Sequence, residues 1–481
     1  MAPGRPAMAA AGAAAVLLVI AVGATAAEEP TERVASARPA AQFLDAMGVN
    51  THWGYAATPY GSAYQSVLGR LVDLDLRHVR DGFNDRIEDL AEHGIATDVI
   101  VNPADGAPEA IKDRIAALNR RHRAIDAVEG PNEADLTWPK ARPPTQFAGK
   151  GFPEGVVAFQ HALYAAIKGD PATAAITVIG PSLGRTYNPG GGFPNPFAAG
   201  ALGDAVDWGN FHPYPFGGNP FSPTFPYGSL AKYYHEADFP SVNLDEYPYG
   251  FQVYGPPFAP KPMAATETGY ATYRGSFLER IGGVSETVQA KYVPRLYAEY
   301  FRLGVARTYL YELADENADP ASTDREAHFG LLRHDLSPKP AYIALRSLTR
   351  LLSEADAASR SQAPLRQLRF ILRAEFPPGY SRLRDIHHLL LQKTDGELLL
   401  LLWHEIANDD ISTRPPREIA PAGVWVRLAF AELPQGIVQY DYDKDWTLAP
   451  HPPRVAGNAI EIEIPDRLTI LRIGKVAAAR R

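Results

Sequence analysis

The stretch Ile125-Asp126-Ala127-Val128-Glu129-Gly130-Pro131-Asn132-Glu133 runs from a short apolar segment into loop-type residues that carry a carboxylate. A second stretch, residues 263–270, reads Met-Ala-Ala-Thr-Glu-Thr-Gly-Tyr and has the same form, with Glu267 near its end. Short apolar runs bounded by turn residues are typical of buried strands. Two parallel strands of one sheet would bring both carboxylates to the same edge. The fold therefore depends on the segments that lie between and around these runs.

Apolar runs alternate with helix-like stretches across residues 42–355. Helical spacing is clear at residues 64–74, 108–121 and 285–304. The strand-like runs are residues 43–49, 78–80, 98–101, 125–128, 176–180, 206–211, 263–266 and 308–311. Eight strands alternating with helices predict a (β/α)8 TIM barrel, with an open doubly wound sheet as the alternative. No Gly-rich dinucleotide fingerprint follows the first run, which disfavours a Rossmann-type cofactor site.

The pattern changes near residue 365 to alternation with period two, as in Ile460-Glu461-Ile462-Glu463-Ile464. Residues 365–476 are therefore predicted to form a C-terminal all-β sandwich. Residues 216–261 are rich in Pro, Gly, Tyr and Phe and lack periodicity. So long an irregular segment predicts a functional loop over the mouth of the barrel.

The N-terminal residues have the pattern of a secretory signal peptide. Arg5 precedes an apolar run, and small residues at 24–26 offer a cleavage site, so residues 1–26 are predicted to be a signal peptide and residues 27–41 a linker. An uncleaved anchor is the alternative. We expect a secreted protein, extracellular or periplasmic, with no integral membrane segment after cleavage. The oligomeric state stays open.

Composition excludes several classes of function. The net charge is −8, whereas a nucleic-acid partner favours a basic face. The chain has no cysteine, so thiolate metal ligands and cysteine nucleophiles are excluded. A large core must then supply the stability of a secreted protein.

Function in a barrel of this kind sits at the carboxyl ends of the strands. Each polar residue there would, taken alone, more often be a surface or structural group, and each tryptophan a core residue about as often as not. Their coincidence at predicted strand ends makes them candidates. Besides Glu133 and Glu267, the candidates for substrate binding are Asn132, Arg80, His212, Tyr214, His52, Trp53, Trp138, Tyr311 and Glu312.

Glu133 and Glu267 would come from the fourth and seventh strands, which face each other across an eight-stranded barrel, and two such carboxylates suit the hydrolysis of a glycosidic bond. One donates a proton to the leaving oxygen, and the other attacks or stabilises the sugar carbon. Asn132 is placed to hydrogen-bond a substrate hydroxyl, and Arg80 to keep the attacking carboxylate ionised. The substrate would be a polysaccharide or oligosaccharide, with no cofactor and no metal.

These motifs carry a family resemblance. Gly130-Pro131-Asn132-Glu133, Thr266-Glu267-Thr268-Gly269, His212-Pro213-Tyr214 and Arg80 resemble clan A of the glycoside hydrolases, and within it family 39 and family 5-like enzymes. The resemblance implies that Glu133 is the general acid/base, Glu267 the nucleophile and Asn132 the contact to the 2-hydroxyl, with retention of configuration. Many members carry a Trp at the end of the eighth strand, where this chain has Tyr311, so Tyr311 or Glu312 would meet the sugar instead.

Two rival functions stay open at this point. A non-catalytic carbohydrate-binding barrel at the cell surface would not need both glutamates. A metal-dependent barrel hydrolase would need several His and Asp at strand ends, where only His52 and His212 qualify. His387, His388 and His404 lack the spacing of metal ligands and are predicted to be structural. The sugar, its linkage and endo or exo action are not predicted.

Overall fold

The computed structural model describes residues 30–185, 187, 192–215, 253–273, 283–354, 363–376, 385–410 and 417–474. The predicted signal peptide lies outside the described residues. So does most of the predicted mouth loop, of which only residues 253–261 are described.

A closed parallel barrel forms the larger part of the protein, as predicted. Its sheet has the strand order β7-β6-β5-β4-β3-β10-β9-β8, and a parallel bridge between Ile179 and Trp208 joins the two ends. The strands are β3 (Met47–Asn50), β4 (His78–Asp81), β5 (Ala96–Ile100), β6 (Ile125–Glu129), β7 (Thr177–Ile179), β8 (Gly209–Phe211), β9 (Met263–Thr268) and β10 (Thr308–Leu310). Closure places the carboxyl ends of β6 and β9 around the same mouth.

Each predicted barrel strand is present, but the first begins later than expected. Residues 40–45 form helix α1 (Ala40–Asp45), and β3 starts only at Met47. Ala-Ala-Gln-Phe-Leu-Asp contains good helix formers, and burying Phe43 and Leu44 on one face gives the helix tertiary support.

Helices cover the barrel and begin at residues suited to helix starts. Pro108 stands in the first turn of α5, and the Ser285 hydroxyl accepts a hydrogen bond from the Val288 N–H at the start of α9. The α-helices after α1 are α2 (Pro59–Ser62), α3 (Tyr64–Asp73), α4 (Ile87–Glu92), α5 (Pro108–Leu118), α6 (Ala134–Lys140), α7 (Glu154–Gly169), α9 (Glu286–Arg302) and α10 (Pro340–Leu352). Short 3₁₀ turns are η1 (Pro103–Asp105), η6 (Pro256–Phe258) and η7 (Arg325–His328).

Two antiparallel sheets form the predicted sandwich. One has the order β1-β11-β16-β20-β19 and the other β18-β17-β21-β13-β12-β2, with β2 added in parallel to β12. Ile460, Ile462 and Ile464 point into the core between the sheets. The strands are β11 (Gln367–Glu375), β12 (Ile386–Gln392), β13 (Leu398–His404), β16 (Val424–Ala429), β17 (Val438–Tyr442), β18 (Leu448–His451), β19 (Arg454–Ala456), β20 (Ala459–Ile464) and β21 (Thr469–Ile473), with a separate pair β14 (Asp409–Asp410) and β15 (Arg417–Glu418).

The segment predicted as a linker belongs to the sandwich, so that prediction is wrong. β1 (Thr31–Ser36) pairs along its whole length with β11, and β2 (Arg38–Pro39) pairs with β12. The open edge of β11 offers unpaired backbone groups, and β1 satisfies them. The sandwich is therefore built from both ends of the described chain.

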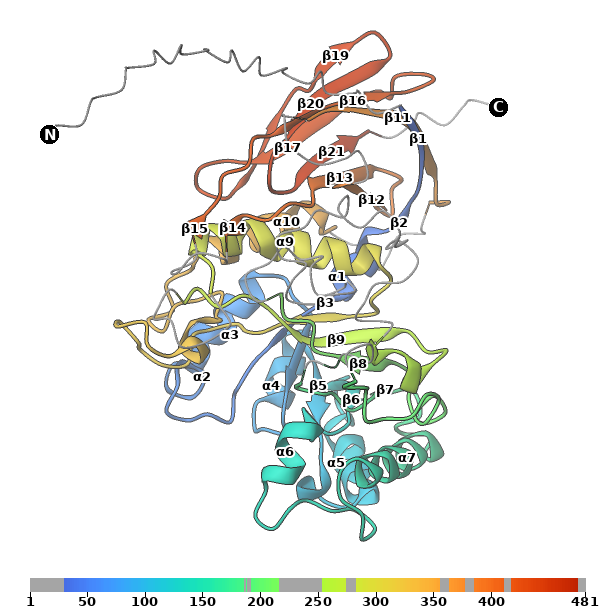
Figure 1. Ribbon diagram of the computed structural model, residues 1–481, viewed down its shortest axis with the longest axis vertical. Coiled ribbons are helices and arrows are strands. Elements are labelled where there is room, and N and C mark those ends of the chain that lie inside the picture. Colours follow the sequence, from blue (N-terminus) through green and yellow to red (C-terminus); the bar gives the residue numbers. More distant parts are fainter. Residues whose placement is uncertain are drawn as a thin grey trace, which may run out of the picture.

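Helices α9 and α10 lie between the barrel and the sandwich (Figure 1). All of α9 from residue 288 to 301 is buried, and one apolar cluster joins α10 to β13 through Leu345 and Leu401. Arg295 of α9 is fully buried and lies 3.0 Å from Glu405 after β13. The two parts therefore share a core.

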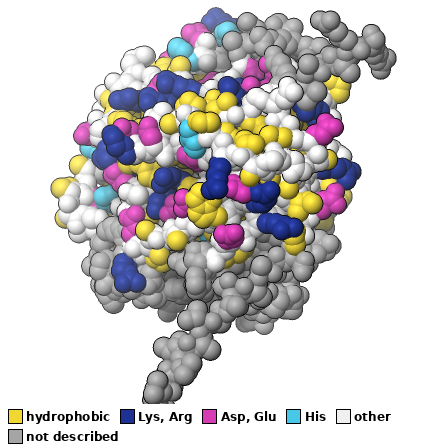
Figure 2. Space-filling view, turned by 90° about the horizontal axis from the view of Figure 1, so that it is seen from above, with side chains coloured by type: hydrophobic (Ala, Val, Ile, Leu, Met, Phe, Trp, Pro, Cys, Tyr) yellow, Lys and Arg dark blue, Asp and Glu magenta, His cyan; other side chains and the backbone are white. Residues whose placement is uncertain are grey.

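The outer face of the protein at its sandwich end is mixed in character. Figure 2 shows charged side chains of both signs interspersed with hydrophobic ones. Trp425 is an example of an exposed hydrophobic residue on β16. No helix within the described ranges has the length and apolarity required to span a bilayer.

Candidate active site

A cavity of about 680 Å³ opens among the loops that follow the barrel strands. Seven of the predicted site residues line it: His52, Arg80, Asn132, Glu133, Tyr214, Glu267 and Tyr311. Further residues on its wall include Asn50, Tyr55, Asp81, Phe83, Arg325, Glu326 and Phe329. The cavity thus collects side chains from loops that are distant in sequence, as expected at the carboxyl ends of barrel strands.

Glu133 and Glu267 face each other across this cavity. One oxygen of each carboxylate and one nitrogen of His212 all lie within 4.8 Å of one another. The Glu133 side chain is 26% exposed, whereas that of Glu267 is 12% exposed. The two carboxylates are therefore close together but differ in their access to solvent.

The backbone turns sharply where β6 delivers Glu133. Glu133 has φ +42° and ψ +50°, a left-handed conformation that costs a non-glycine residue about 1–2 kcal/mol. The Glu133 N–H donates to the Ser182 hydroxyl at 2.9 Å, and the Thr137 N–H donates to the Glu133 carbonyl at 3.0 Å. These bonds hold the turn and aim the carboxylate into the cavity.

Arg80, at the end of β4, uses all five of its N–H donors inside the site. The guanidinium donates twice to Glu129, at 2.6 Å from Nε and 2.8 Å from Nη2. Nη1 donates to Glu267 Oε1 at 2.7 Å and to Asn50 Oδ1 at 2.8 Å. Nη2 also donates to Asn132 Oδ1 at 2.7 Å. Because no donor is left over, each of these partners has a fixed place relative to the others.

The orientation of Asn132 follows from these bonds. Its Oδ1 accepts hydrogen bonds from Arg80 and, at 3.1 Å, from the Ser182 hydroxyl. The amide NH2 must then point the other way, and Asn132 lines the cavity. A donor is therefore presented to any molecule that enters.

Positive neighbours keep Glu267 ionised although it is buried. Burial raises its pKa, but His212 and Arg80, with a hydrogen bond from Tyr214, outweigh burial and lower the pKa to about 2. The Tyr214 hydroxyl donates to Oε2 at 3.0 Å, opposite the Arg80 bond to Oε1. Both oxygens are held, so the carboxylate is fixed as well as charged.

His212 lies between the two carboxylates. The Thr266 hydroxyl donates to Asn210, so it accepts from His212 Nε2 at 3.1 Å, which assigns the proton to Nε2. Nδ1 faces Glu133 Oε1 at 3.1 Å and Glu267 Oε2 at 3.5 Å. Burial lowers the pKa of His212, but Glu267 and Glu133 outweigh burial and raise it. A proton on Nδ1 therefore donates toward Glu133.

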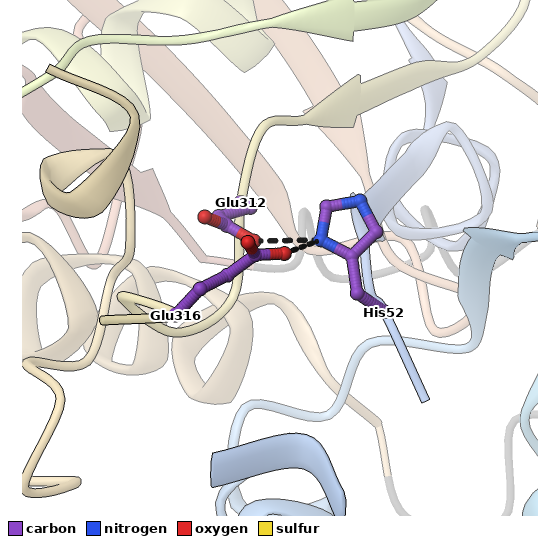
Figure 3. Close-up of side chains that lie close together, drawn as sticks. All are labelled: His52, Glu312 and Glu316. Carbon is purple, nitrogen blue, oxygen red and sulfur yellow. Dashed lines mark ion pairs between the residues drawn. The ribbon is translucent and has the colours of Figure 1, made fainter. Parts of the chain in front are cut away.

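His52, on the loop after β3, lines the cavity and forms a second charged cluster with Glu312 and Glu316, which do not line it (Figure 3). Its Nδ1 lies 3.1 Å from Glu312 and also contacts Glu316. Burial lowers the pKa of His52, but the two glutamates outweigh it and raise the pKa to about 10. His52 is therefore an imidazolium at neutral pH.

Glu312 does not line the cavity, so the prediction that it meets the substrate is not supported by its position. It is fully buried behind His52, and the Tyr60 hydroxyl donates to it at 3.3 Å. Burial raises its pKa to about 7, with His52 acting in the opposite direction. Tyr311, joined to Glu312 by a cis peptide bond, does line the cavity and packs edge-on against His52 and Phe329.

Trp53 and Trp138 also lie outside the cavity, in the hydrophobic core. Trp53 is 5% exposed and packs edge-on against Tyr60 and Tyr64, and Trp138 is 2% exposed. A tryptophan near a strand end is either a platform or a core residue, and the sequence alone does not separate the two.

Sequence reasoning missed the charged interior of the barrel. Glu129, Asp98 and Asp126 are buried there together with Arg80 and Arg307. Asp126 accepts a hydrogen bond from Arg307 at 3.1 Å, whereas neither carboxylate oxygen of Asp98 has a hydrogen-bond partner among the described residues. Polar residues alternating with apolar ones, as in His78-Val79-Arg80, were the available signal, because alternate residues of a barrel strand face inward.

Three groups of side chains within the described ranges have the composition of metal ligands: His52 with Glu312 and Glu316, Glu133 with His212 and Glu267, and Glu299 with His387 and Glu405. An arginine lies against a carboxylate of the second and third groups, Arg80 at 2.7 Å from Glu267 and Arg295 at 3.0 Å from Glu405. His387 binds Glu299 at 2.8 Å between β12 and α9, a structural ion pair.

Comparison with known proteins rests on the fold. No protein-family model matches the chain, and no curated protein matches it in sequence. A family 39 glycoside hydrolase from the gut symbiont Bacteroides cellulosilyticus WH2 is 16% identical, with a TM-score of 0.54 over 91% of this chain and 81% of that one. A GH51 arabinofuranosidase from Xanthomonas axonopodis pv. citri is 12% identical, with a TM-score of 0.52 over 93% and 100%. CelM2, a bifunctional glucanase-xylanase from a metagenome library, is 10% identical, with a TM-score of 0.51 over 89% and 99%. A barrel with Glu133 and Glu267 at its mouth, joined to a β-sandwich, gives this chain the fold of the clan A glycoside hydrolases.

Proposed function

We propose that the protein is a secreted retaining glycoside hydrolase that cleaves O-glycosidic bonds in a polysaccharide or oligosaccharide by double displacement. The observation that carries the proposal is the pair Glu133 and Glu267, whose nearest oxygens lie within 4.8 Å. Retaining enzymes hold their two carboxyl groups roughly 5–5.5 Å apart, whereas inverting enzymes leave room for a water between groups roughly 6.5–9.5 Å apart.

The different surroundings of the two carboxylates support different roles. Glu267 is held ionised by His212 and Arg80, as a nucleophile must be. Glu133 is more exposed, and its ring partner His212 can exchange a proton with it through Nδ1. Glu133 is therefore the acid/base.

In the first step, Glu267 attacks the anomeric carbon, and the bond from that carbon to the leaving oxygen breaks. Glu133 gives its proton to that oxygen, so the leaving sugar departs as an alcohol. In the second step, Glu133 takes a proton from water, and the resulting hydroxide displaces Glu267 from the anomeric carbon. Configuration is inverted twice and hence retained.

The neighbouring side chains support the transition state in this mechanism. The Asn132 NH2 donates to the 2-hydroxyl, a bond that strengthens as positive charge develops on the sugar ring. Tyr311 offers an aromatic ring to the sugar, and His52, whose pKa is raised to about 10, lies on the same wall of the cavity.

Identification of the substrate and the stereochemistry test the function together. The purified protein is screened against a polysaccharide panel, and proton NMR follows the first anomer released from a cleaved substrate. Retention is expected, and initial release of the opposite anomer would exclude double displacement. Export is tested separately, by sequencing the N-terminus of protein recovered outside the cytoplasm, which should begin near residue 27.

A further inference from the structure

Glu129 is a buried carboxylate with no place in the mechanism above. It ends β6, four residues before Glu133, is fully buried and does not line the cavity. Removing a carboxylate from water costs several kcal/mol unless its partner repays the loss. Its hydrogen-bond partner is Arg80, through two parallel N–H bonds of 2.6 and 2.8 Å.

We propose that Glu129 is a positioning residue of the proposed glycosidase, which acts through Arg80 on the nucleophile and on the 2-hydroxyl contact at once. The fork of two bonds fixes the plane of the guanidinium. Once that plane is fixed, Nη1 can only point at Glu267 and Asn50, and the second proton of Nη2 only at Asn132.

The charge of Glu129 has a second effect on the site. Arg80 stands between two carboxylates, Glu129 and Glu267. Burial lowers the pKa of Arg80, but Glu129 and then Glu267 outweigh it and raise the pKa well above its ordinary value. Without Glu129, the whole positive charge of Arg80 would face Glu267, and an overstabilised carboxylate is a weaker nucleophile.

The variant Glu129→Gln distinguishes the effects of hydrogen bonding and charge from those of side-chain packing. Gln has the same shape, but it offers one acceptor where the carboxylate offers two, and its NH2 meets a guanidinium N–H donor. The guanidinium must turn, and the Asn132 amide loses its fixed orientation. Glu129→Asp keeps the charge and should be intermediate.

The test compares two substrates in one enzyme sample: aryl glycosides of the cleaved sugar with and without the 2-hydroxyl. The ratio of their kcat/KM values does not depend on how much of the sample is folded. We expect Glu129→Gln to lower kcat/KM at least tenfold and to lower this ratio at least fivefold, toward the ratio of Asn132→Ala. Asp98→Asn, a change at a buried carboxylate of the same interior that does not bond Arg80, should leave the ratio unchanged.

A second comparison tests whether Glu129 acts through Arg80. In an Arg80→Ala background, Glu129→Gln should change kcat/KM less than twofold, because the guanidinium through which Glu129 is proposed to act is absent. An unchanged ratio in Glu129→Gln, or an equal loss in both backgrounds, would overturn the proposal.

A crystal structure of Glu129→Gln tests the positioning role independently of the proposed function, because the structure can be determined even if the protein has no glycosidase activity. The Nη1 to Glu267 Oε1 distance, 2.7 Å in the parent, should exceed 3.5 Å or Arg80 should leave Asn132. An unmoved guanidinium would overturn the positioning role even in an active enzyme. A displaced guanidinium in a protein that cleaves no glycoside would overturn only the proposed function.

Discussion

Arg80 Nη1 lies 2.7 Å from Glu267 Oε1, and the same guanidinium binds the amide oxygen of Asn132. One residue therefore holds the proposed nucleophile in its charged form and also fixes the direction of the amide that we propose contacts the substrate. This contact stabilises the folded protein at pH values above 4.5, the ordinary pKa of the Glu267 carboxyl group. The stabilisation is lost as the pH falls toward about 2, the pKa of Glu267 in the folded protein.

Arg80→Lys should move the acid limb of the kcat/KM profile to higher pH. Lysine cannot keep the forked bonds to Glu129 while also reaching Glu267, so the nucleophile loses part of its stabilising charge. An opposite charge in contact is worth about 1–3 pKa units, and we expect a shift of about one unit. The measurement is kcat/KM between about pH 2 and 8, with brief exposure at the acid end, and an unmoved acid limb would argue against the assigned role of Arg80.

Gly184→Ala should lower activity while sparing stability. A Cβ at this position would stand 2.7 Å from the Glu133 carboxyl group and 2.5 Å from Leu136 Cδ1. The ends of flexible side chains can give way, so the fold survives, but the acid/base is pushed out of line. We expect kcat to fall about 100-fold, the scale of general acid–base catalysis, with a melting temperature close to that of the parent. Full activity would show that Glu133 needs no such fixed position.

Asp98→Asn should stabilise the protein increasingly as pH rises. Burial and the neighbouring Glu129 raise the pKa of Asp98 well above its ordinary value. The folded state then holds a proton that the unfolded state releases above pH ~4. The parent should lose stability relative to the variant by about 1.4 kcal/mol per pH unit between pH ~4 and the raised pKa. Urea unfolding at several pH values measures this, and parallel curves would contradict it.

Arg295→Ala should destabilise the whole protein by about 3–5 kcal/mol, because it removes the buried cation that lies 3.0 Å from the Glu405 carboxylate. Its guanidinium also donates to the Ile406 carbonyl at 3.1 Å, which ties α9 to the sandwich. Arg350→Ala is the control, since Arg350 is 60% exposed in its pair with Asp73 and should cost less than about 1 kcal/mol. Urea denaturation compares the two, and equal small losses would mean that the buried pair does not join the two parts.

Much of the architecture could be read from the sequence because its signals are local. The eight barrel strands are apolar runs, and the sandwich strands alternate with period two, as at residues 460–464. The segment at 31–36 was misread because a short edge strand carries little apolar signal of its own, and its pairing with β11 is fixed by a partner more than 300 residues away.

The candidate site residues could be predicted where they stand at the ends of barrel strands. They were harder to predict where side-chain packing decides whether a residue reaches the cavity. Glu133, Glu267, Arg80 and Asn132 stand at strand ends and reach one cavity. Trp53 and Glu312 stand at similar positions, yet their side chains turn into the core. Glu129 was overlooked because a buried strand residue is normally apolar, and only its partner Arg80 explains it.

The central claim is that Glu267 forms a covalent bond to the sugar. A 2-deoxy-2-fluoro glycoside with a good leaving group, made from the cleaved sugar, should trap that intermediate, because the fluorine slows its hydrolysis more than its formation. Mass spectrometry of the labelled protein is then expected to show one added fluorosugar on the peptide that carries Glu267, and none in Glu267→Gln. A label on another residue, or none in an enzyme that hydrolyses the parent glycoside, would contradict the account.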